Sequence, residues 1–427
     1  MPQTVLPFKL EKTLEKLTAH AGLVLAGEYM QALNLNRIID THMPSAKSAV
    51  GYRASNYIQA LILMLLGGGQ SIADMRVIKN DISLQKLLNI KMIPSESAIG
   101  DWLSRLGKKG GLDGLEKVQS NLISIALNNE SQTDYTLDID ATQIISHKDS
   151  AAYTYKGEKG YMPIVGHIAE NGLVIGDDFR SGNIAPASEN FEFIKYCESQ
   201  LPTGKRFSAI RIDSAGYQAD IINYCEQNNQ TFAIGAPLDK AIKQGVLSIP
   251  EDQWEKYKDR EIAEMVHCMN KTNKAFRLIV TRKARQQDLF NHDEDAYFYH
   301  AIASNKTETA SDVKDWYCQR GETSENKIKE LKLGMGMDRM PCGSQEGNAL
   351  FFRIGVLAYN ISIMFKTDVL PEKWQRYQIK TVRWQLFQVA GKVVTGSRYL
   401  KLKINETYLV LFEEIRTLIW QRKCQLE

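Results

Sequence analysis

The feature that most constrains the fold of this chain is a change in hydrophobic spacing near residue 130. Between residues 10 and 130, apolar residues recur at intervals of three and four, which indicates a series of short amphipathic helices. From Tyr135 to Ile139, apolar residues instead alternate with polar ones, and Asp138 and Asp140 lie on the polar side. That alternation predicts a β-strand with one acidic face. The chain therefore contains both a helical part and a sheet.

Strand and helix patterns alternate through the rest of the chain. Three strands joined by hairpins come first, and helices and strands then follow in turn, which predicts a mixed α/β fold with a sheet flanked by helices. A charged stretch from 236 to 304 interrupts this pattern and indicates an inserted subdomain. Strands are expected at 135–140, 161–168, 173–177, 207–212, 231–234, 277–282 and 297–303, and helices at 27–39, 52–66, 71–79, 83–88, 113–128, 188–200, 218–227, 311–333 and 348–365.

A chain of 427 residues is too long for one simple core, so several domains are expected. The short helices before residue 130 are what a helix-turn-helix DNA-binding module needs, and a generic helical bundle fits them equally well. The expected parts are a helical N-terminal DNA-binding region (1–130), the first part of the core (131–235), an inserted β-rich subdomain (236–308), the second part of the core (309–366) and a basic C-terminal region (367–427).

Composition excludes several classes of protein. The chain is 44% hydrophobic and 24% charged with a net charge of +3, which is typical of a soluble globular protein and gives no sign of nucleic-acid binding by itself. The six cysteines are scattered, so neither a disulfide framework nor a zinc site is expected. The longest apolar stretch, 58–66, is too short to cross a bilayer, and residues 1–12 lack a signal-peptide pattern. We expect a cytoplasmic protein with no membrane partner.

Three carboxylates are candidates for one site. Asp140 ends the first predicted strand and Asp213 ends a later one, so both would stand at the edge of the sheet where ligand sites form. Glu325 lies on the predicted helix 311–333, where Ile328 and Leu331 supply an apolar stripe that would turn it towards the sheet. Converging carboxylates can hold two divalent cations for in-line phosphoryl transfer.

Each of these residues also has an ordinary structural interpretation. An aspartate at a strand end often serves as a turn residue or a helix cap, and a helix glutamate is often a solvated charge. Asp138 shares a face with Asp140 and competes with it, although Asp140 is favoured because it stands at the strand end. The residue pattern alone leaves these alternatives open.

The sequence resembles the DDE transposases of bacterial insertion sequences (DDE transposase group 1), in the branch marked by a Tyr-x-x-Arg…Glu…Lys signature. The segments 137–142 and 211–216 are similar to the family's two aspartate segments, and the insertion before Glu325 and the segment 344–360 also match. The similarity covers nearly the whole chain. The signature residues are Tyr317, Arg320, Glu325 and Lys332.

One departure from the family pattern concerns the spacing within the signature. The family has three residues between its arginine and glutamate, whereas this chain has four, from Gly321 to Ser324. Glu322 is therefore a rival for the glutamate position. Glu325 is preferred because Lys332 follows it in register, and the extra residue is expected at a helix start, with Thr323 or Ser324 as cap.

The resemblance implies an RNase H-like catalytic core interrupted by a largely β insertion. It implies that Asp140, Asp213 and Glu325 are catalytic and bind two Mg²⁺ (or Mn²⁺) ions. The implied reaction is hydrolysis at each end of an insertion sequence, followed by attack of the freed 3′-OH on target DNA. The DNA partners would be double-stranded terminal inverted repeats and target DNA.

Further residues are expected to contact DNA by the same resemblance. Arg320 and Lys332 would bind phosphates near the cut, and Tyr317 would brace the strand, although an ordinary helix surface also fits all three. Members of this branch commonly pass through a DNA hairpin with a displaced base. Trp254 is a candidate to stack on that base, with local packing as the alternative. The basic tail fits a phosphate-contacting surface. A homodimer assembled on DNA is plausible because two ends must be handled together.

Two other functions compete with an active DNA transposase. One is a non-cutting transposase relic that binds DNA ends or acts as a repressor, and the other is a metal-dependent endonuclease on the same fold. The intact set of three carboxylates argues against the relic.

Overall fold

The computed structural model describes residues 5–6, 8–45, 51–128, 130–285 and 296–427. The chain divides into two compact units. The first contains residues 1–37, 46–99 and 365–427, and the second contains residues 38–45 and 100–364. The expected boundary at residue 130 therefore differs from the division between the units, because residues 100–128 pack with the sheet.

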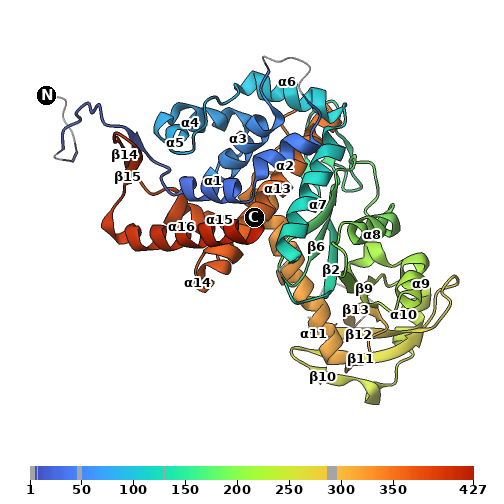
Figure 1. The fold of residues 1–427 in the computed structure, drawn as a ribbon. Helices are drawn as coiled ribbons and strands as arrows, with labels where there is room; N and C mark the ends of the chain where they lie inside the picture. Colours follow the sequence, from blue (N-terminus) through green and yellow to red (C-terminus); the bar gives the residue numbers. More distant parts are fainter. Residues whose placement is uncertain (1–4, 7, 46–50, 129, 286–295) are drawn as a thin grey trace. The chain divides into compact units, whose positions relative to one another are not determined.

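The first unit is mainly helical (Figure 1). Asp368 links separate stretches of this unit, because its carboxylate accepts hydrogen bonds from Tyr29 at 2.6 Å and from Arg422 at 3.0 Å. Its elements are β1 (Leu17–Thr18), α1 (Leu23–Ala32), α3 (Ala54–Gly67), a 3₁₀ turn (Ile72–Asp74), α4 (Met75–Asn80), α5 (Ile82–Leu87), α14 (Glu372–Gln375), α15 (Ile379–Val382), a π turn (Arg383–Phe387), β14 (Gly391–Thr395), β15 (Leu400–Lys403) and α16 (Glu406–Leu426).

The second unit is built on a nine-stranded sheet in the order β10-β11-β12-β13-β9-β8-β2-β6-β7. The strands are β2 (Asp134–Ala141), β6 (Ile164–Ile168), β7 (Val174–Asp178), β8 (Arg206–Ile212), β9 (Thr231–Ala236), β10 (Glu255–Tyr257), β11 (Arg260–His267), β12 (Phe276–Ala284) and β13 (Tyr297–Ser304). A smaller three-stranded sheet contains β3 (Ile144–Ile145), β4 (Ala152–Tyr153) and β5 (Lys159–Tyr161).

The five strands β2, β6, β7, β8 and β9 form the core of this sheet. β6 and β7 add to one side of β2 as antiparallel strands, while β8 and β9 add to its other side as parallel strands. The turn between β6 and β7 uses the expected Asn171-Gly172 pair, with Gly172 at a φ of 78°. The mixed α/β fold expected from the sequence is therefore confirmed.

Helices cover both faces of this core. On one face, α8 (Asn190–Ser199) lies so close that a Cβ added at Gly166 would stand 2.7 Å from the Cys197 sulfur. The opposite face carries Asp138 and Arg211 and is covered by α11 (Ala310–Arg320), whose Trp316 carbonyl accepts a hydrogen bond from Arg211 at 2.6 Å. The other helices of the unit are α7 (Gly111–Leu127), α9 (Ala219–Gln227), α10 (Lys240–Leu247) and α12 (Asn326–Lys329), with 3₁₀ turns at Ser214–Gly216 and Glu251–Gln253 and π turns at Gly321–Glu325 and Glu330–Gly334.

Three helices cross the division between the units: α2 (Leu35–His42), α6 (Glu96–Gly107) and α13 (Gln345–Val369). The side-chain amide of Asn360 on α13 pairs with the backbone of the edge strand β7, accepting from the Val174 N–H and donating to its carbonyl, both at 2.8 Å. Among the described residues, α13 is the only unbroken helix that is long and apolar enough to span a membrane. Its most apolar stretch is completely buried in the protein. It is therefore a core helix here.

Two expected elements were wrong, and some strands were not expected. The helix expected at 27–39 breaks into α1 and α2 because Asn34 adopts a left-handed φ of 55°. The strand expected at 161–168 is interrupted at Pro163, which has no N–H to donate to a strand partner. The charged insertion continues the central sheet, since β13 pairs with β9. Its strands β10 and β11, and the β14–β15 hairpin of the C-terminal region, were not expected.

Candidate active site

Asp140 and Asp213 occupy neighbouring positions on two adjacent parallel strands. The β2–β8 pairing aligns Ile139 with Ile212, so the next residue on each strand is an aspartate. Asp140 belongs to the last residues of β2, and its side chain is 17% exposed. Asp213 comes directly after β8, and its carboxylate accepts a hydrogen bond from the Ala215 N–H at 2.9 Å. Two carboxylates therefore stand side by side at the carboxyl end of the parallel strands, as expected.

Asp138 is held by a different partner. It is fully buried and faces Arg211 across the same two strands. The guanidinium donates two hydrogen bonds to the Asp138 carboxylate, at 2.6 and 2.8 Å. This paired geometry places Asp138 in the core as a structural anion, which favours Asp140 as the residue available for chemistry.

The helix over this face brings an arginine to Asp140. Arg320 is 6% exposed, and its Nη2 lies 3.3 Å from Oδ1 of Asp140 and 3.3 Å from the carbonyl oxygen of Ile139. Burial alone would lower the pKa of Arg320, but Asp140 and Asp213 raise it above its ordinary value. The guanidinium is therefore a fixed cation against the carboxylate pair.

The electrostatics of Asp140 report on all three candidate carboxylates. Burial raises the pKa of Asp140 to about 6, although the Arg320 charge opposes this rise. The negative charges of Asp213 and Glu325 also contribute to this rise. Glu325 itself is exposed on the π turn that follows α11. The structure thus brings Asp140, Asp213 and Glu325 near enough for their charges to interact.

Among the described residues, no three His, Cys, Asp or Glu side chains are close enough to form a preassembled metal site. The donor set nevertheless suits a hard cation, because all three groups offer carboxylate oxygens, which Mg²⁺ prefers. A divalent cation would also relieve the mutual repulsion that raises the pKa of Asp140. Glu325 is the exposed member of the three candidate carboxylates.

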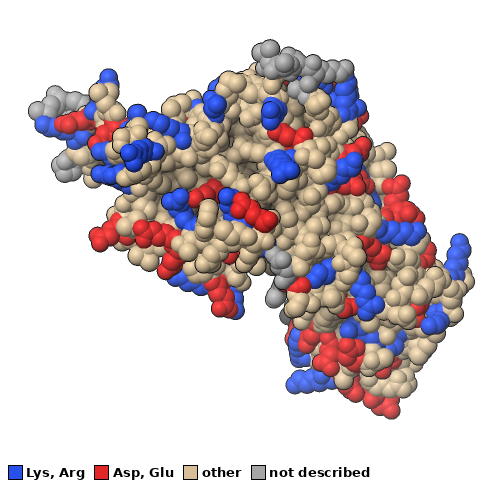
Figure 2. Space-filling model, in the orientation of Figure 1, with Lys and Arg blue, Asp and Glu red and all other residues tan. Residues whose placement is uncertain are grey.

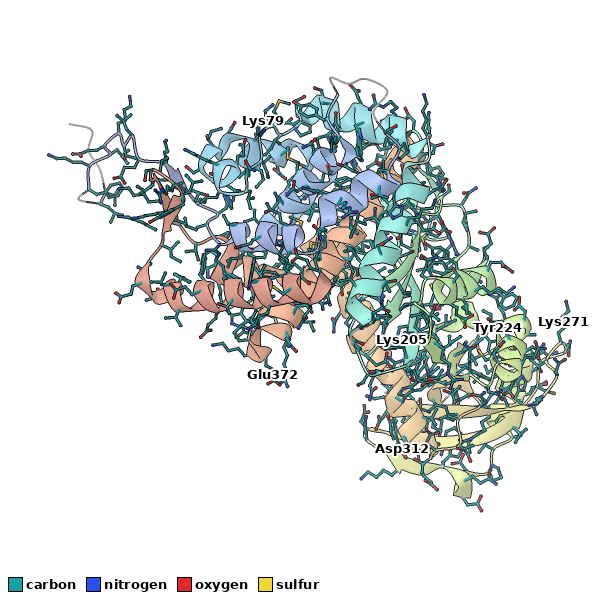
Figure 3. The ribbon with its side chains drawn as sticks, viewed as in Figure 1. Lys79, Lys205, Tyr224, Lys271, Asp312 and Glu372 are labelled. Atoms are coloured by element: carbon teal, nitrogen blue, oxygen red, sulfur yellow. The ribbon has the colours of Figure 1, made fainter. Side chains whose placement is uncertain are left out.

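The extra residue of the signature is absorbed by a π turn. The helix begins at the Thr309 cap, whose hydroxyl accepts from the Asp312 N–H at 3.2 Å, and it continues through the π turn Gly321–Glu325. Asp312 marks this first turn in Figure 3. The expected helix start with a Thr323 or Ser324 cap is therefore wrong. A π turn accommodates one additional residue without ending the helix, and such turns are frequent at functional sites. The side chains of Glu322 and Thr323 lie outside the described residues.

Ser324 is a residue of this turn that the sequence did not single out for chemistry. It is fully buried, and its hydroxyl has no hydrogen-bond partner among the described residues. The Nε of Arg320 is also buried without a partner in the described part of the chain. Two buried polar atoms of this helical segment therefore lack a partner among the described residues, and a bound ligand or water would satisfy them.

Tyr317 and Lys332 lie on the same helical segment as Arg320. Tyr317 is 9% exposed and packs on Ala233 and Ile302, and a Cβ added at Gly235 would lie 3.0 Å from its hydroxyl. The Lys332 ammonium donates to the Thr142 hydroxyl at 3.2 Å and to the Gln143 carbonyl at 2.6 Å. Lys332 therefore holds the loop that follows Asp140. Burial lowers the pKa of Lys332.

Trp254 lies in the insertion, after the 3₁₀ turn Glu251–Gln253. It is 9% exposed, and the Arg282 guanidinium lies 4.2 Å from the centre of its ring. Arg282 is in turn held by Glu251 and Glu261. The ring therefore packs locally in this structure, and a base could stack on the covered face only after Arg282 moved.

Sequence reasoning missed Arg211 as a determinant of the site. Its position was nevertheless readable, because Arg211 precedes Asp213 by two residues just as Asp138 precedes Asp140. If the two strands pair in parallel, Arg211 lies opposite Asp138, and the two residues must be interpreted together.

A mixed sheet with aspartates at the ends of two parallel strands and a glutamate on the covering helix is an arrangement suited to an enzyme that acts on nucleic-acid strands. The sequence profile described as "Transposase DDE domain group 1" matches residues 6–420. The chain belongs to this family and is a DNA transposase.

Other comparisons add little to this assignment. No curated protein matches the chain. The structure of a piggyBac transposase synaptic complex with hairpin DNA is similar over 97% of this chain and 84% of that chain, with 11% sequence identity and a TM-score of 0.46.

Proposed function

We propose that this transposase cuts the ends of an insertion sequence and joins them to target DNA by two-metal phosphoryl transfer at Asp140, Asp213 and Glu325. The observation that carries the proposal is the β2–β8 register, which pairs Ile139 with Ile212 and so puts Asp140 and Asp213 side by side at the carboxyl ends of two parallel strands. The charges of Asp213 and Glu325 both act on Asp140 and help to raise its pKa, and bound cations would offset this repulsion. We further assign the chain to the bacterial branch with the Tyr-Arg-Glu-Lys signature, from the residues themselves.

The proposed cofactors are two Mg²⁺ or Mn²⁺ ions, which when bound activate the attacking oxygen and stabilise the leaving oxygen. Asp140 and Asp213 would be the fixed ligands, because one lies within a strand and the other is held by the Ala215 N–H. Glu325 would complete the set from the helix. Both cutting and joining are in-line displacements, so one set of ligands serves both steps.

Arg320 and Lys332 would hold the DNA backbone at the cut. Arg320 has a buried Nε without a partner among the described residues, which leaves donor capacity for a phosphate oxygen beside Asp140. Lys332 fixes the loop after β2 and would position it against the strand. Tyr317 would brace the strand from the β9 side, where its ring packs.

Other partners follow from the reaction. The helices of the N-terminal region are proposed to bind double-stranded DNA at the terminal inverted repeats. Trp254 is proposed to stack on a displaced base if the reaction passes through a hairpin, with Arg282 leaving its ring. Two ends must be cut together, so a homodimer on DNA in the cytoplasm is the proposed working form.

The direct test uses DNA that carries the terminal repeats flanking the coding region. With Mg²⁺ or Mn²⁺, the wild-type protein should cut at the repeat ends. Asp213→Asn should reduce the rate on the order of 10³-fold or more, since the metal contribution amounts to several kcal/mol. A wild-type rate no higher than that of the variant would refute the proposal.

The same experiment separates the competing functions. Strand-transfer products in the presence of target DNA exclude a simple metal-dependent endonuclease. If Asp140→Asn leaves every activity of the protein unchanged in cells, the non-cutting relic or repressor is the better description.

A further inference from the structure

The basic C-terminal tail contains cations that pack into the fold and cations that are exposed. In its first part, Lys373, Arg376 and Lys380 are exposed. Two other cations point into the fold: the Lys366 ammonium donates to the Tyr377 carbonyl at 3.1 Å, and Arg383 donates to the carbonyls of Leu65 and Leu66 at 2.5 and 2.8 Å. Trp374 is also buried, with 5% exposure. Lys366, Trp374 and Arg383 therefore stabilise the first unit and are not available to a partner.

The second part of the tail is the β14–β15 hairpin, residues 389–405, which we call the ribbon. The ribbon contains four cationic side chains and no aspartate or glutamate. The cations are Lys392, Arg398, Lys401 and Lys403, of which the last three are exposed. In Figure 2, a cluster of Lys and Arg side chains lies where Figure 1 labels β14 and β15. The ribbon is therefore a concentrated positive surface.

The strand register puts the lysines together on one face. Lys392 is directly opposite Lys403, and Val394 is opposite Lys401. The alternate positions, including buried Val393, face the fold. Like charges directly opposite in an antiparallel pair are destabilising, so this face costs free energy in the unbound protein. A polyanion laid along it would remove that cost.

These lysines have little internal compensation. The Lys392 ammonium pairs with Glu15, but both side chains are at least 40% exposed and such pairs contribute little. In the described part of the chain, Lys401 and Lys403 have no carboxylate partner. The Lys401 ammonium instead lies 5.7 Å from the ring centre of Tyr399, which is 65% exposed at the hairpin tip.

We propose that the lysine face of the ribbon binds the phosphate backbone of double-stranded DNA. Lys401 and Lys403 are about 7 Å apart along β15, which is roughly two base-pair steps of a duplex. The choice of DNA rests on the proposed function, because DNA is the polyanion on which this enzyme acts. The contact is with phosphate and reads no sequence.

The test measures binding to a fluorescent duplex of unrelated sequence, in EDTA, over a series of salt concentrations. The variant is Lys392→Gln, Lys401→Gln and Lys403→Gln together. The slope of log affinity against log salt should decrease in magnitude by about 2 to 3, with affinity about tenfold weaker or more at low salt. Conversion of the same three lysines to arginine should restore wild-type binding.

The matched control removes the same charge from the insertion by Lys240→Gln, Lys256→Gln and Lys271→Gln, all of which are exposed. Lys271 projects outward from its loop in Figure 3. An equal loss of slope in both triple variants would overturn the proposal, and so would a wild-type slope in the ribbon variant. Anionic phosphatidylserine vesicles are the third probe, and lysine-dependent binding to vesicles but not to DNA would also overturn it.

The outcome is separable from that of the proposed function. Binding to an unrelated duplex in EDTA requires neither cleavage nor metal. A protein that fails to cut its own ends but loses duplex affinity with the ribbon lysines would refute the proposed chemistry and leave the ribbon assignment standing. Thermal unfolding of each variant tests whether it is folded. The ribbon variant should be at least as stable as the wild type.

Discussion

Two rows of charged residues on the same pair of strands differ in their electrostatics, because one row pairs opposite charges and the other brings like charges together. In the inner row, Asp138 of β2 faces Arg211 of β8, and the two charges neutralise one another in the core. In the outer row, Asp140 of β2 lies beside Asp213, which comes directly after β8. The two carboxylates repel one another. The inner row stabilises the sheet, whereas the outer row is destabilised in the free protein and suited to cations. Functional sites commonly lower the stability of the protein that contains them.

The largest effect is expected when the inner row is broken. Asp138→Asn leaves the buried Arg211 charge without its anion, which should lower the free energy of unfolding by about 3–5 kcal/mol. Urea unfolding measures the loss. The matched control is Asp134→Asn, because Asp134 pairs with Arg206 at the start of the same two strands but in solvent. That change should cost less than about 1 kcal/mol. Similar losses in the two variants would contradict the structural role of the inner row.

The outer row should respond in the opposite direction. Asp140→Asn removes a carboxylate whose pKa is raised from 3.8 to about 6, which corresponds to a penalty of up to roughly 3 kcal/mol at neutral pH. We therefore expect the variant to be more stable than the wild type by about 1 to 3 kcal/mol, because loss of the Arg320 pairing offsets part of the gain. Urea unfolding in EDTA provides the measurement. A less stable variant would show that Asp140 is a structural residue like Asp138.

The gain from Asp140→Asn should also depend on pH. A folded-state pKa above the ordinary value means that the folded protein holds a proton that the unfolded chain releases. Wild-type stability therefore decreases, relative to the variant, as pH rises from about 4 to about 6, and the difference is constant above that window. Unfolding in EDTA at several pH values tests this. A difference that does not change between pH 4 and 7 would be inconsistent with the raised pKa of Asp140.

A smaller effect is expected from Arg320, which contacts Asp140 of the outer row. Arg320→Gln removes the charge that opposes the rise in the pKa of Asp140, so the pH window of the stability loss should move upward. The coupling between Arg320 and Asp140 in a double-mutant cycle should be about 1–2 kcal/mol. Additive effects of Arg320→Gln and Asp140→Asn would mean that the 3.3 Å approach contributes nothing.

The smallest effect is expected from the π turn. Deleting Gly321, where an added Cβ would meet no atom within 4 Å, should convert the turn to a regular helix and keep Glu325 facing the outer row. Stability should change by less than about 1 kcal/mol, and end cleavage should be retained. Inserting one alanine after Gly321 is the contrasting variant, since a second extra residue rotates Glu325 away. Loss of cleavage in the deletion variant would show that the π geometry itself is required.

Much of the site could be read from local patterns. The alternation around Asp140 located the first strand, and the signature residues located the covering helix. The competition between Asp138 and Asp140 could not be decided in this way, because both lie on one face of β2. The partner that distinguishes them, Arg211, comes from a strand 73 residues away. The continuation of the helix through Glu325 was also hidden, because a π turn has no local signal as strong as a cap.

The sequence by itself determined much of the order of helices and strands, the positions of the two aspartates at strand ends and the membership of the family. These properties depend on neighbouring residues, whose spacing is the period of a strand or a helix. Only the tertiary structure decided which charges are neutralised, which cations of the tail face inward and which lysines share one side of the ribbon. Those outcomes depend on the residue that long-range pairing places opposite each charge, and on whether water remains there to solvate it.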